Sequence, residues 1–200
     1  MTILVQALEA PLTAEELKKA VGKEKLRTLQ GKGTLTAYTL AHEGTTKPKD
    51  LSQGTAIQLS WGKRIIQALS SVVKAGTKFF FGHGKNTNSH RGRLPVGEVV
   101  ATIEKEIGGR LNHIVIGHFP NSADVQNMDV VSMEAVVDTD ENNIVTAIRN
   151  ISGIAMASSN QESPAFPGAV RLAQIQAFEN ANQEGETLEK NNLLDLSLIH

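Results

Sequence analysis

The chain has 200 residues, which suits one domain of ordinary size or one domain with a short appendage. Hydrophobic residues make up 40% of it and charged residues 20%, the balance of a folded globular protein rather than a disordered one. Because 20 Lys and Arg residues nearly cancel 21 Asp and Glu residues, no strong overall field would recruit nucleic acid or an acidic membrane. The absence of cysteine excludes disulfides, thiolate nucleophiles and Cys-ligated zinc.

No segment has the pattern of an export signal or a membrane helix. No apolar run approaches the ~20 residues that a membrane-spanning helix needs. The first residues, MTILVQALEAPLTAEE, lack a basic region and soon become acidic, unlike a signal peptide. We therefore expect a protein that is made and used in a cytoplasm, with neither a membrane nor a nucleic acid as partner.

The first part of the chain predicts helices around a strand. Thr13 has capping-box spacing with Glu16 and predicts a short helix after it. Residues 32–40 alternate in the manner of a strand, and residues 42–53 are polar and predict an exposed loop. Ser60 is predicted to cap a second helix, whose apolar residues repeat at helical spacing.

The middle of the chain predicts mainly strands. Residues 78–81 (KFFF) are too few for a helix and predict a strand buried on both faces. Further strands are expected at 96–100 and 113–119, with a helical turn at 104–109 that ends in paired glycines. Residues 129–137 alternate as a strand does, so that one face should carry Val131, Met133, Ala135 and Val137 and the other Ser132, Glu134 and Val136.

The last part predicts one or two strands within 144–157 and a helix over 168–181. Strands that outnumber helices in the middle of the chain favour an α+β fold built round an antiparallel or mixed β-barrel or sheet. The expected organisation is an N-terminal helical segment (1–30), a core (31–180), and an acidic tail or the opening of a further, charged helix (181–200).

The six histidines do not predict a metal site. His113 and His118 are five residues apart in a predicted strand, so they should fall on opposite faces and cannot grip one ion together. No HExxH motif and no nucleotide-binding glycine fingerprint occurs in the sequence. We therefore expect neither a metal nor a cofactor.

His83 is a candidate general base because it follows the predicted strand 78–81, where that strand meets a polar loop. The glycines on either side let the backbone turn and leave the imidazole accessible. A histidine in a surface loop without any role would show the same pattern. His90 lies seven residues further along the loop and competes for any role given to His83.

Ser132 is a candidate nucleophile within the predicted strand 129–137. A serine hydroxyl becomes reactive when an imidazole accepts its proton, and here the fold must provide that pairing, since 49 residues separate Ser132 from His83. A serine on the same strand face as Glu134 can equally be a hydrogen-bonded filler. The surrounding sequence, DVVSMEAVV, has no glycine and therefore no G-x-S-x-G elbow.

The order of several short motifs resembles the prohead (capsid maturation) proteases of tailed bacteriophages. The matching segments are FFFGHG (79–84), PVGEVV (95–100), VVSMEAVV (130–137), IVTAIRNISGIAMASS (144–159) and SPAFPGA (163–169). The resemblance covers roughly residues 30–180, and the order and spacing of the motifs carry it more than any single one.

This resemblance implies a fold similar to that of herpesvirus assemblin, a β-barrel wrapped by helices with Ser and His on neighbouring strands. The nucleophile of the family corresponds to Ser132. Its base corresponds to His83 by the preceding strand, although the H-x4-P spacing common in the family is met by His90. We favour His83, because a position at a strand end is better preorganised than one deep in a loop.

The third catalytic residue is where this sequence departs from the family. Asn150 stands where a glutamate is common, and an amide stabilises an imidazolium less than a carboxylate does. Glu134 and Asp138 remain alternatives, as does a second histidine in the assemblin manner, His113 or His118.

The resemblance also implies partners and a location. Such an enzyme would cleave scaffold and major capsid proteins inside the immature phage capsid, in the host cytoplasm, would often cut itself, and would require no cofactor; it could form a homo-oligomer. Two other classes remain open from the sequence. One is a non-enzymatic scaffold or capsid-associated protein that retains the fold, and the other is an unrelated barrel that binds a small molecule.

Overall fold

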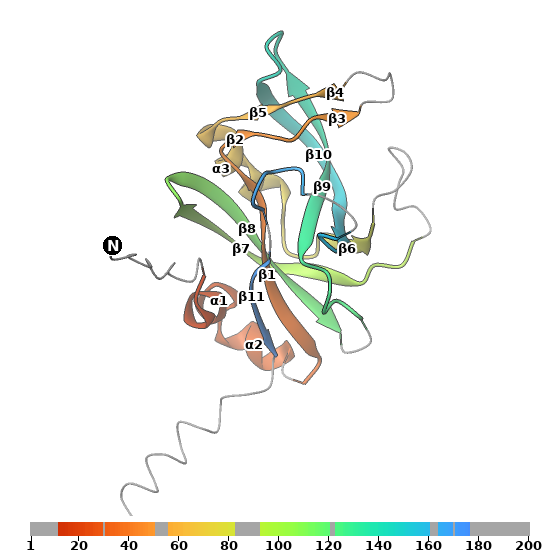
Figure 1. Cartoon of the computed structure of the whole chain (residues 1–200). Helices are drawn as coiled ribbons and strands as arrows, with labels where there is room; N and C mark the ends of the chain where they lie inside the picture. The colour runs from red at the N-terminus through yellow and green to blue at the C-terminus, as the bar shows by residue number, and fades with distance from the viewer. Residues whose placement is uncertain are drawn as a thin grey trace, which may run out of the picture.

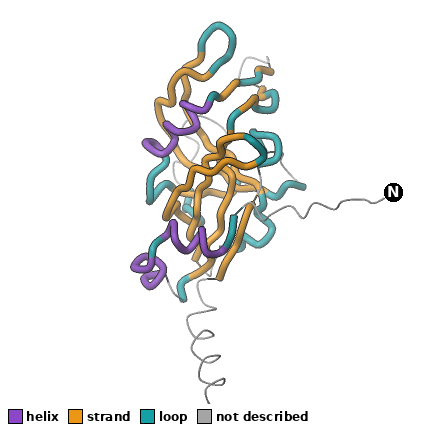
Figure 2. The backbone as a smooth tube through the Cα atoms, turned by 90° about the vertical axis from the view of Figure 1, so that its left-hand side faces the viewer, coloured by secondary structure: helices purple, strands orange, loops and turns teal. Residues whose placement is uncertain are grey.

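The computed structural model describes residues 12–29, 31–50, 56–82, 93–120, 123–160, 164–169 and 171–176. Within these residues the chain forms three helices and eleven strands, so the predicted α+β class is confirmed. Strands form the middle of the molecule and helices lie on its outside (Figures 1 and 2).

Seven strands form the main sheet, in the spatial order β11-β1-β8-β7-β6-β10-β9. Their bounds are β1 (Gly33–His42), β6 (Lys78–Phe81), β7 (Gly97–Ile107), β8 (Arg110–Pro120), β9 (Val130–Thr139), β10 (Val145–Ala157) and β11 (Arg171–Gln176). Two small ladders pair β2 (Gly44–Thr45) with β5 (Ser60–Trp61) and β3 (Lys49–Asp50) with β4 (Ala56–Ile57). The sheet is mixed, because β6 runs parallel to β10 while the other neighbours are antiparallel.

The main sheet is open between β11 and β9 in the described residues, so the predicted barrel is not closed by a strand ladder. The sheet nevertheless bends until its two edges approach each other. The backbone N–H of Arg171 donates to the carbonyl oxygen of Asp129 at 2.8 Å. The hydroxyl of Tyr38 donates to the carbonyl oxygen of Met128, also at 2.8 Å. These two hydrogen bonds link β11 and its neighbour β1 to the segment just before β9, where a closed barrel would have a ladder.

Two hydrophobic clusters pack on the two faces of the sheet. The main core lies on one face beneath α3 (Lys63–Val72) and includes Tyr38, Phe79 and Phe119, whose ring centroids are 5.0–6.3 Å apart. The second core lies on the other face, beneath α1 (Ala14–Val21) and α2 (Lys23–Leu29). Residues 12–29 of the predicted N-terminal helical segment are thus packed directly against the sheet.

The predicted capping box of α1 is confirmed. The backbone N–H of Glu16 donates to the Thr13 hydroxyl oxygen at 3.1 Å, and the Glu16 carboxylate accepts from the Thr13 N–H at 2.8 Å. The same carboxylate accepts from the ammonium group of Lys105 on β7 at 2.6 Å. Its hydrogen bonds, first with Lys105 and then with Thr13, lower the pKa of Glu16 to about 2. Glu16 therefore both closes the capping box of the helix and ties the helix to the sheet.

Two predicted helices are strands in the structure. Residues 104–109 belong to a long hairpin of β7 and β8, in which Gly108 and Gly109 form the turn with φ angles of +59° and +74°. A tight hairpin turn requires positive φ at both central residues, so the paired glycines form this turn and do not end a helix. The predicted helix over 168–181 is wrong, because β11 (Arg171–Gln176) is a strand that pairs with β1. Residues 177–181 lie outside the described part of the chain.

Two further expectations about the first 60 residues are wrong. Ser60 does not cap α3, because it lies in β5 opposite Thr45; Gly62 occupies the cap position without a side-chain bond. The predicted exposed loop 42–53 begins with a buried residue, His42, and contains the short strands β2 and β3. Two-residue ladders within residues 44–61 decide both cases, and they are too short to show a strand pattern in the sequence.

Candidate functional site

Ser132 lies in the middle of β9, on the face that points away from the main core. The predicted alternation is confirmed, since Val131 and Met133 pack into the main core on the other face. Ser132 pairs with Ala155 across the β9–β10 ladder and is 9% exposed. The strand therefore holds this serine at a fixed place in the sheet.

The hydroxyl of Ser132 is unusual because it is buried without a hydrogen bond. Its Oγ has no partner within the part of the chain that the structure describes. Most buried hydroxyls are paired, and an unpaired one costs about 1–3 kcal/mol of desolvation. A serine that only filled the sheet would be expected to bond a neighbouring carbonyl, as Ser152 on β10 does with Glu134 at 3.2 Å.

The strand that leads to the candidate bases lies two strands away from Ser132. Across β10, Ala155 pairs with Phe80 of β6 on one side and with Ser132 on the other, so the three residues form one row. The small side chain of Ala155 is all that stands between the other two in that row. The backbone N–H of Gly82, the residue before His83, donates to the carbonyl oxygen of Met156 at 2.8 Å. His83 and His90 themselves lie outside the described residues.

The register separates two of the candidate third residues from Ser132. Asn150 pairs with Val136, four residues along β9, which corresponds to about 13 Å at the usual strand rise. Asp138 is six residues away and forms an ion pair with Arg149 at 2.6 Å. Glu134 is two residues from Ser132 on the same strand face, or about 7 Å. Of the three, the structure brings only Glu134 near the serine.

The two candidate second histidines are also apart from Ser132. His113 and His118 lie on opposite faces of β8, as predicted: His113 shares its face with the main core and His118 with the second core. Burial lowers the pKa of His113 to about 4, and it also lowers the pKa of His118. Ser132 points away from the main core, so the structure does not bring His113 to it.

We expect His113 to make the fold sensitive to acid. Its two ring nitrogens are buried without hydrogen-bond partners in the described residues, and its pKa is about 4 in place of 6.5. When the pH falls from 6.5 toward 4, His113 binds a proton in the unfolded chain but not in the folded chain. The free energy of unfolding should therefore fall by roughly 2–3 kcal/mol between about pH 8 and pH 4.5 on account of this residue. Urea denaturation at both pH values measures the loss.

The matched variant is His113→Leu, in which an apolar side chain that cannot be protonated replaces the imidazole. It should lose about 2–3 kcal/mol less stability than the wild type over the same pH interval. Other groups titrate in both chains and cancel in the comparison. Equal losses in the two chains would show that His113 is not the acid-sensitive group.

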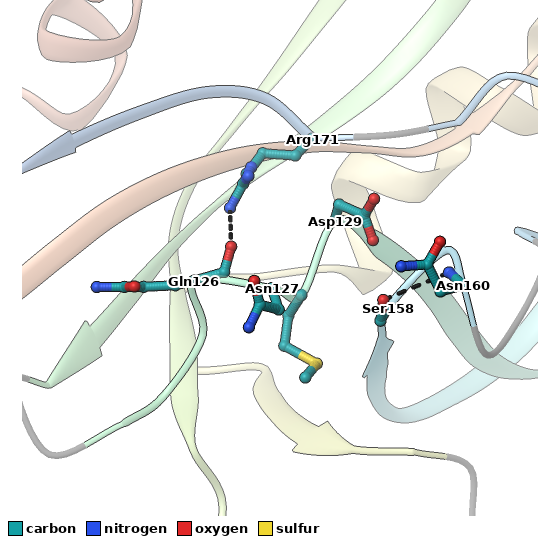
Figure 3. Close-up of a pocket in the computed structure, with 7 residues that line it drawn as sticks. Gln126, Asn127, Asp129, Ser158, Asn160 and Arg171 are labelled. Atoms are coloured by element: carbon teal, nitrogen blue, oxygen red, sulfur yellow. Dashed lines mark hydrogen bonds between the residues drawn. The ribbon is translucent and has the colours of Figure 1, made fainter.

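A polar cleft of about 610 Å³ lies where β10 ends and where β9 and β11 begin (Figure 3). Its lining residues are Gln126, Asn127, Met128, Asp129, Ser158, Asn160 and Arg171. The guanidinium of Arg171 donates to the carbonyl oxygen of Gln126 at 2.9 Å. Amide, hydroxyl and carbonyl groups around one cation and one carboxylate suit a neutral polar ligand, such as the backbone of a peptide. Sequence reasoning missed this cleft, because its residues come from three distant segments.

Asp129 in this cleft is held as a carboxylate. It accepts from the hydroxyl of Ser159 at 2.5 Å and from the backbone N–H of the same residue at 2.6 Å. These bonds, the hydroxyl bond first, lower its pKa despite some opposing desolvation. Asp129, three residues before Ser132 in the chain, thereby fixes the segment that leaves β10.

The described residues contain no group of three or more His, Asp or Glu side chains that could hold a metal ion. No helix in the described ranges is both long and apolar enough to cross a bilayer. Comparison with protein-family models, with curated proteins and with solved structures gave no match to this chain.

Proposed function

We propose that the chain is a serine endopeptidase, with Ser132 as nucleophile and His83 as general base. The observation that carries the proposal is the buried hydroxyl of Ser132, which has no hydrogen-bond partner in the described chain. A catalytic serine needs an imidazole nitrogen as acceptor, and the strand that leads into His83 lies across β10 from Ser132. His90 is the alternative base.

We propose Glu134 as the residue that orients the base, in preference to Asn150 and Asp138. Its position two residues from Ser132 on the same strand face supports this choice. A carboxylate stabilises the imidazolium that forms when the base takes up the serine proton. In the first step the serine oxygen bonds to the substrate carbonyl carbon, the C–N bond breaks, and the leaving amine receives the proton from the imidazolium. Water then attacks the acyl-enzyme ester with the imidazole as base, which releases the acid and restores the serine hydroxyl.

We propose further that the fold is similar to that of assemblin and that the substrates are scaffold and major capsid proteins. The order of the short motifs supports the first point, together with a bent mixed sheet that has helices on both faces. The polar cleft begins about 10 Å along β9 from Ser132 and offers amide and hydroxyl groups to an extended peptide. Work inside an immature capsid, in the host cytoplasm, and self-cleavage belong to the same proposal.

Labelling with a fluorophosphonate tests the proposal without a known substrate. An activated serine oxygen attacks the phosphorus, a P–O bond forms, and fluoride leaves. We expect one adduct per chain in the wild type and none in Ser132→Ala, as measured by the mass of the intact protein. Ser152→Ala is the matched control, because Ser152 lies on the neighbouring strand with its hydroxyl already bonded, and it should label like the wild type. Equal labelling of wild type and Ser132→Ala would contradict the assignment.

A second candidate is a non-enzymatic scaffold or capsid-associated protein that retains the fold. The shielding of the Ser132 hydroxyl favours it, since a residue that is 9% exposed offers little access to a peptide bond. This candidate predicts no adduct in any of the three chains. Labelling that appears only after binding to scaffold protein would instead support the peptidase.

A further inference from the structure

Positive charge gathers on α1, on α2 and on the turn that leads from α2 into β1. Between residues 18 and 32 the chain has six basic side chains and one acidic side chain, Glu24. Lys18 is partly exposed and the other basic residues are exposed. We call the six residues the basic patch: Lys18, Lys19, Lys23, Lys25, Arg27 and Lys32.

The described part of the chain neutralises little of this charge. Lys18 pairs with Glu15 on its own helix at 3.3 Å, and the other five residues of the basic patch form no ion pair within the described residues. The charge of Lys25 acts on Glu98, whose pKa is lowered first by its bond to Lys78, but Glu98 is already paired with that lysine at 2.5 Å. Because charges of one sign gathered on a surface attract the opposite sign, the basic patch suits an acidic partner.

The strand β11 ends close to the basic patch. Its last residue, Gln176, pairs with Thr34 at the start of β1. Lys32 lies two residues before Thr34, and its backbone N–H donates to the carbonyl oxygen of Leu29, the last residue of α2, at 3.0 Å. Leu172 of β11 packs against the second core beneath α1 and α2 (Figure 1). The chain therefore continues from a point next to the helices that carry the patch.

The sequence that follows β11 has the opposite charge. Residues 179–195, which we call the acidic segment, lie outside the described residues and contain five acidic side chains and one basic side chain. Glu179 is the third residue after Gln176, and three residues span at most about 10 Å. The acidic residues thus begin within reach of Lys32 and are spread over a stretch long enough to follow both helices. They are Glu179, Glu184, Glu186, Glu189 and Asp195.

We infer that the acidic segment docks on the basic patch of the same chain. This inference does not depend on the proposed function. Attachment to β11 keeps the segment at an effective concentration on the order of millimolar around the patch, so weak contacts suffice to hold it. One exposed ion pair contributes little, whereas several act together. Because ions screen such pairs, docking should be strong in dilute salt and lost in concentrated salt.

A spin label in the acidic segment tests the inference on the full chain. The chain has no cysteine, so Gln183→Cys gives one site for a nitroxide, which broadens the ¹H–¹⁵N signals of amides close to it. We expect broadened α2 amides in about 0.01 M salt and recovery of these signals in about 1 M salt, where the Debye length falls from about 30 Å to about 3 Å. Equal broadening at both salt concentrations is the behaviour of a loose tether and would overturn the inference.

Neutralising α2 tests the role of its charge. In the triple variant Lys23→Gln, Lys25→Gln, Arg27→Gln, the broadening in dilute salt should fall toward the level seen in concentrated salt. Three exposed ion pairs together are worth about tenfold in the docking equilibrium. Broadening that stays at the wild-type level in this variant would contradict the inference. If the variant does not fold, the salt series on the wild-type sequence decides alone.

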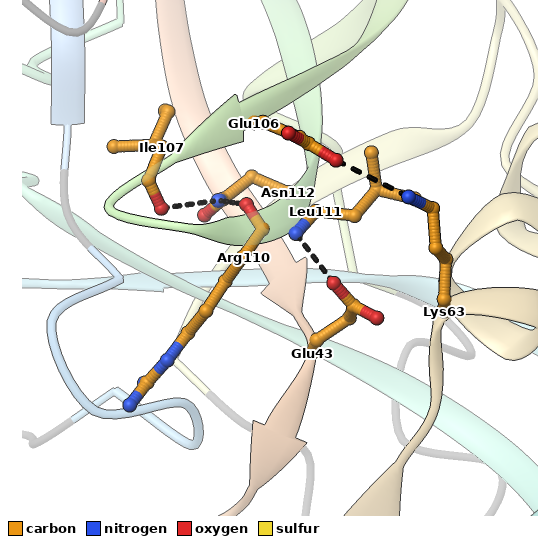
Figure 4. A network of polar contacts seen from close by, with 7 residues as sticks. All are labelled: Glu43, Lys63, Glu106, Ile107, Arg110, Leu111 and Asn112. Atoms are coloured by element: carbon orange, nitrogen blue, oxygen red, sulfur yellow. Dashed lines mark hydrogen bonds and ion pairs between the residues drawn. The ribbon is translucent and has the colours of Figure 1, made fainter.

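The matched control removes the same charge on the other face of the sheet, at and just after α3. The triple variant Lys63→Gln, Arg64→Gln, Lys74→Gln should broaden the α2 amides as the wild type does. Lys63 pairs with Glu106 at 3.2 Å on the exposed surface, a contact that contributes little to the fold (Figure 4). An equal loss of broadening in both triple variants would mean that net charge, and not the basic patch, holds the segment, and it would contradict the inference.

A mixed sample separates docking within one chain from docking between two copies. A spin-labelled chain without ¹⁵N is added to a ¹⁵N chain without the label, so that only contacts between copies broaden the observed signals. We expect the α2 amides of the ¹⁵N chain to stay sharp in dilute salt. Broadened α2 amides in this mixture would mean that the acidic segment binds a second copy, and they would overturn the inference.

Discussion

The variant His83→Ala should cleave its substrates at least about a thousandfold more slowly than the wild-type chain, whereas His90→Ala should keep a measurable rate. Without the imidazole, no group accepts the serine proton, and loss of a general base or of a triad member typically costs several powers of ten in rate. The hydrogen bond of Gly82 to Met156 fixes the chain immediately before His83, and we favour His83 over His90 because it directly follows this strand in the sequence. Quantified cleavage of a scaffold or capsid substrate provides the measurement.

The pH profile of the wild type is the control for this assignment. A histidine base works only when it is neutral, so the rate should rise with pH within the range of about 5 to 8. A rate that is flat over this range, with chemistry limiting, would exclude a histidine base. The opposite mutational pattern, with His90→Ala inactive and His83→Ala active, would move the role to His90.

The variant Gly97→Ala should destabilise the fold by about 3 kcal/mol or more. A β-carbon at this position would lie 2.7 Å from the carbonyl oxygen of His118 and 2.6 Å from Cε1 of Phe119. Both neighbours are buried, and one is a backbone atom of the adjoining strand, so neither can move without disturbing the main core. Urea denaturation followed by circular dichroism measures the change in the free energy of unfolding.

Gly62→Ala is the matched control for this prediction. Gly62 precedes α3 with an ordinary φ of −85°, and a β-carbon there would meet nothing within 4 Å. Its replacement should change stability by less than about 1 kcal/mol. Equal stability of Gly97→Ala and Gly62→Ala would mean that the ring of Phe119 is not packed over Gly97 as described.

Features that depend on neighbouring residues could be predicted from the sequence. The capping box of Thr13 involves side chains one helical turn apart, and the alternation in β9 depends only on the period of a strand. The same holds for the short strand of three phenylalanines, although its third member, Phe81, is exposed.

Features that depend on distant partners could not be predicted. Leu172 and its neighbours have helical spacing, but pairing with β1, more than 130 residues earlier, makes this segment a strand. The polar segment after His42 is partly buried because Pro167 and Phe166 come from the other end of the chain. In each case tertiary contacts outweigh local preference.

The candidate site shows the same division. Ser132 could be selected from its place in an apolar strand, but its missing hydrogen bond could only be seen in the fold. Asn150 is predicted as the third catalytic residue because it occupies the position where the resembling family commonly has a glutamate. Asn150 lies five residues along β10 from Ala155, the partner of Ser132, and which residues of β9 and β10 face each other could only be seen in the fold.

The central claim is that Ser132 is a peptidase nucleophile, and the most direct measurement is a time course of the purified chain on a gel, wild type beside Ser132→Ala. The proposal predicts that the wild type cuts itself or added scaffold protein into discrete fragments over time. Ser132→Ala should remain intact under the same conditions, because it lacks the oxygen that forms the acyl-enzyme. Fragments that appear at the same rate in both chains would contradict the proposal.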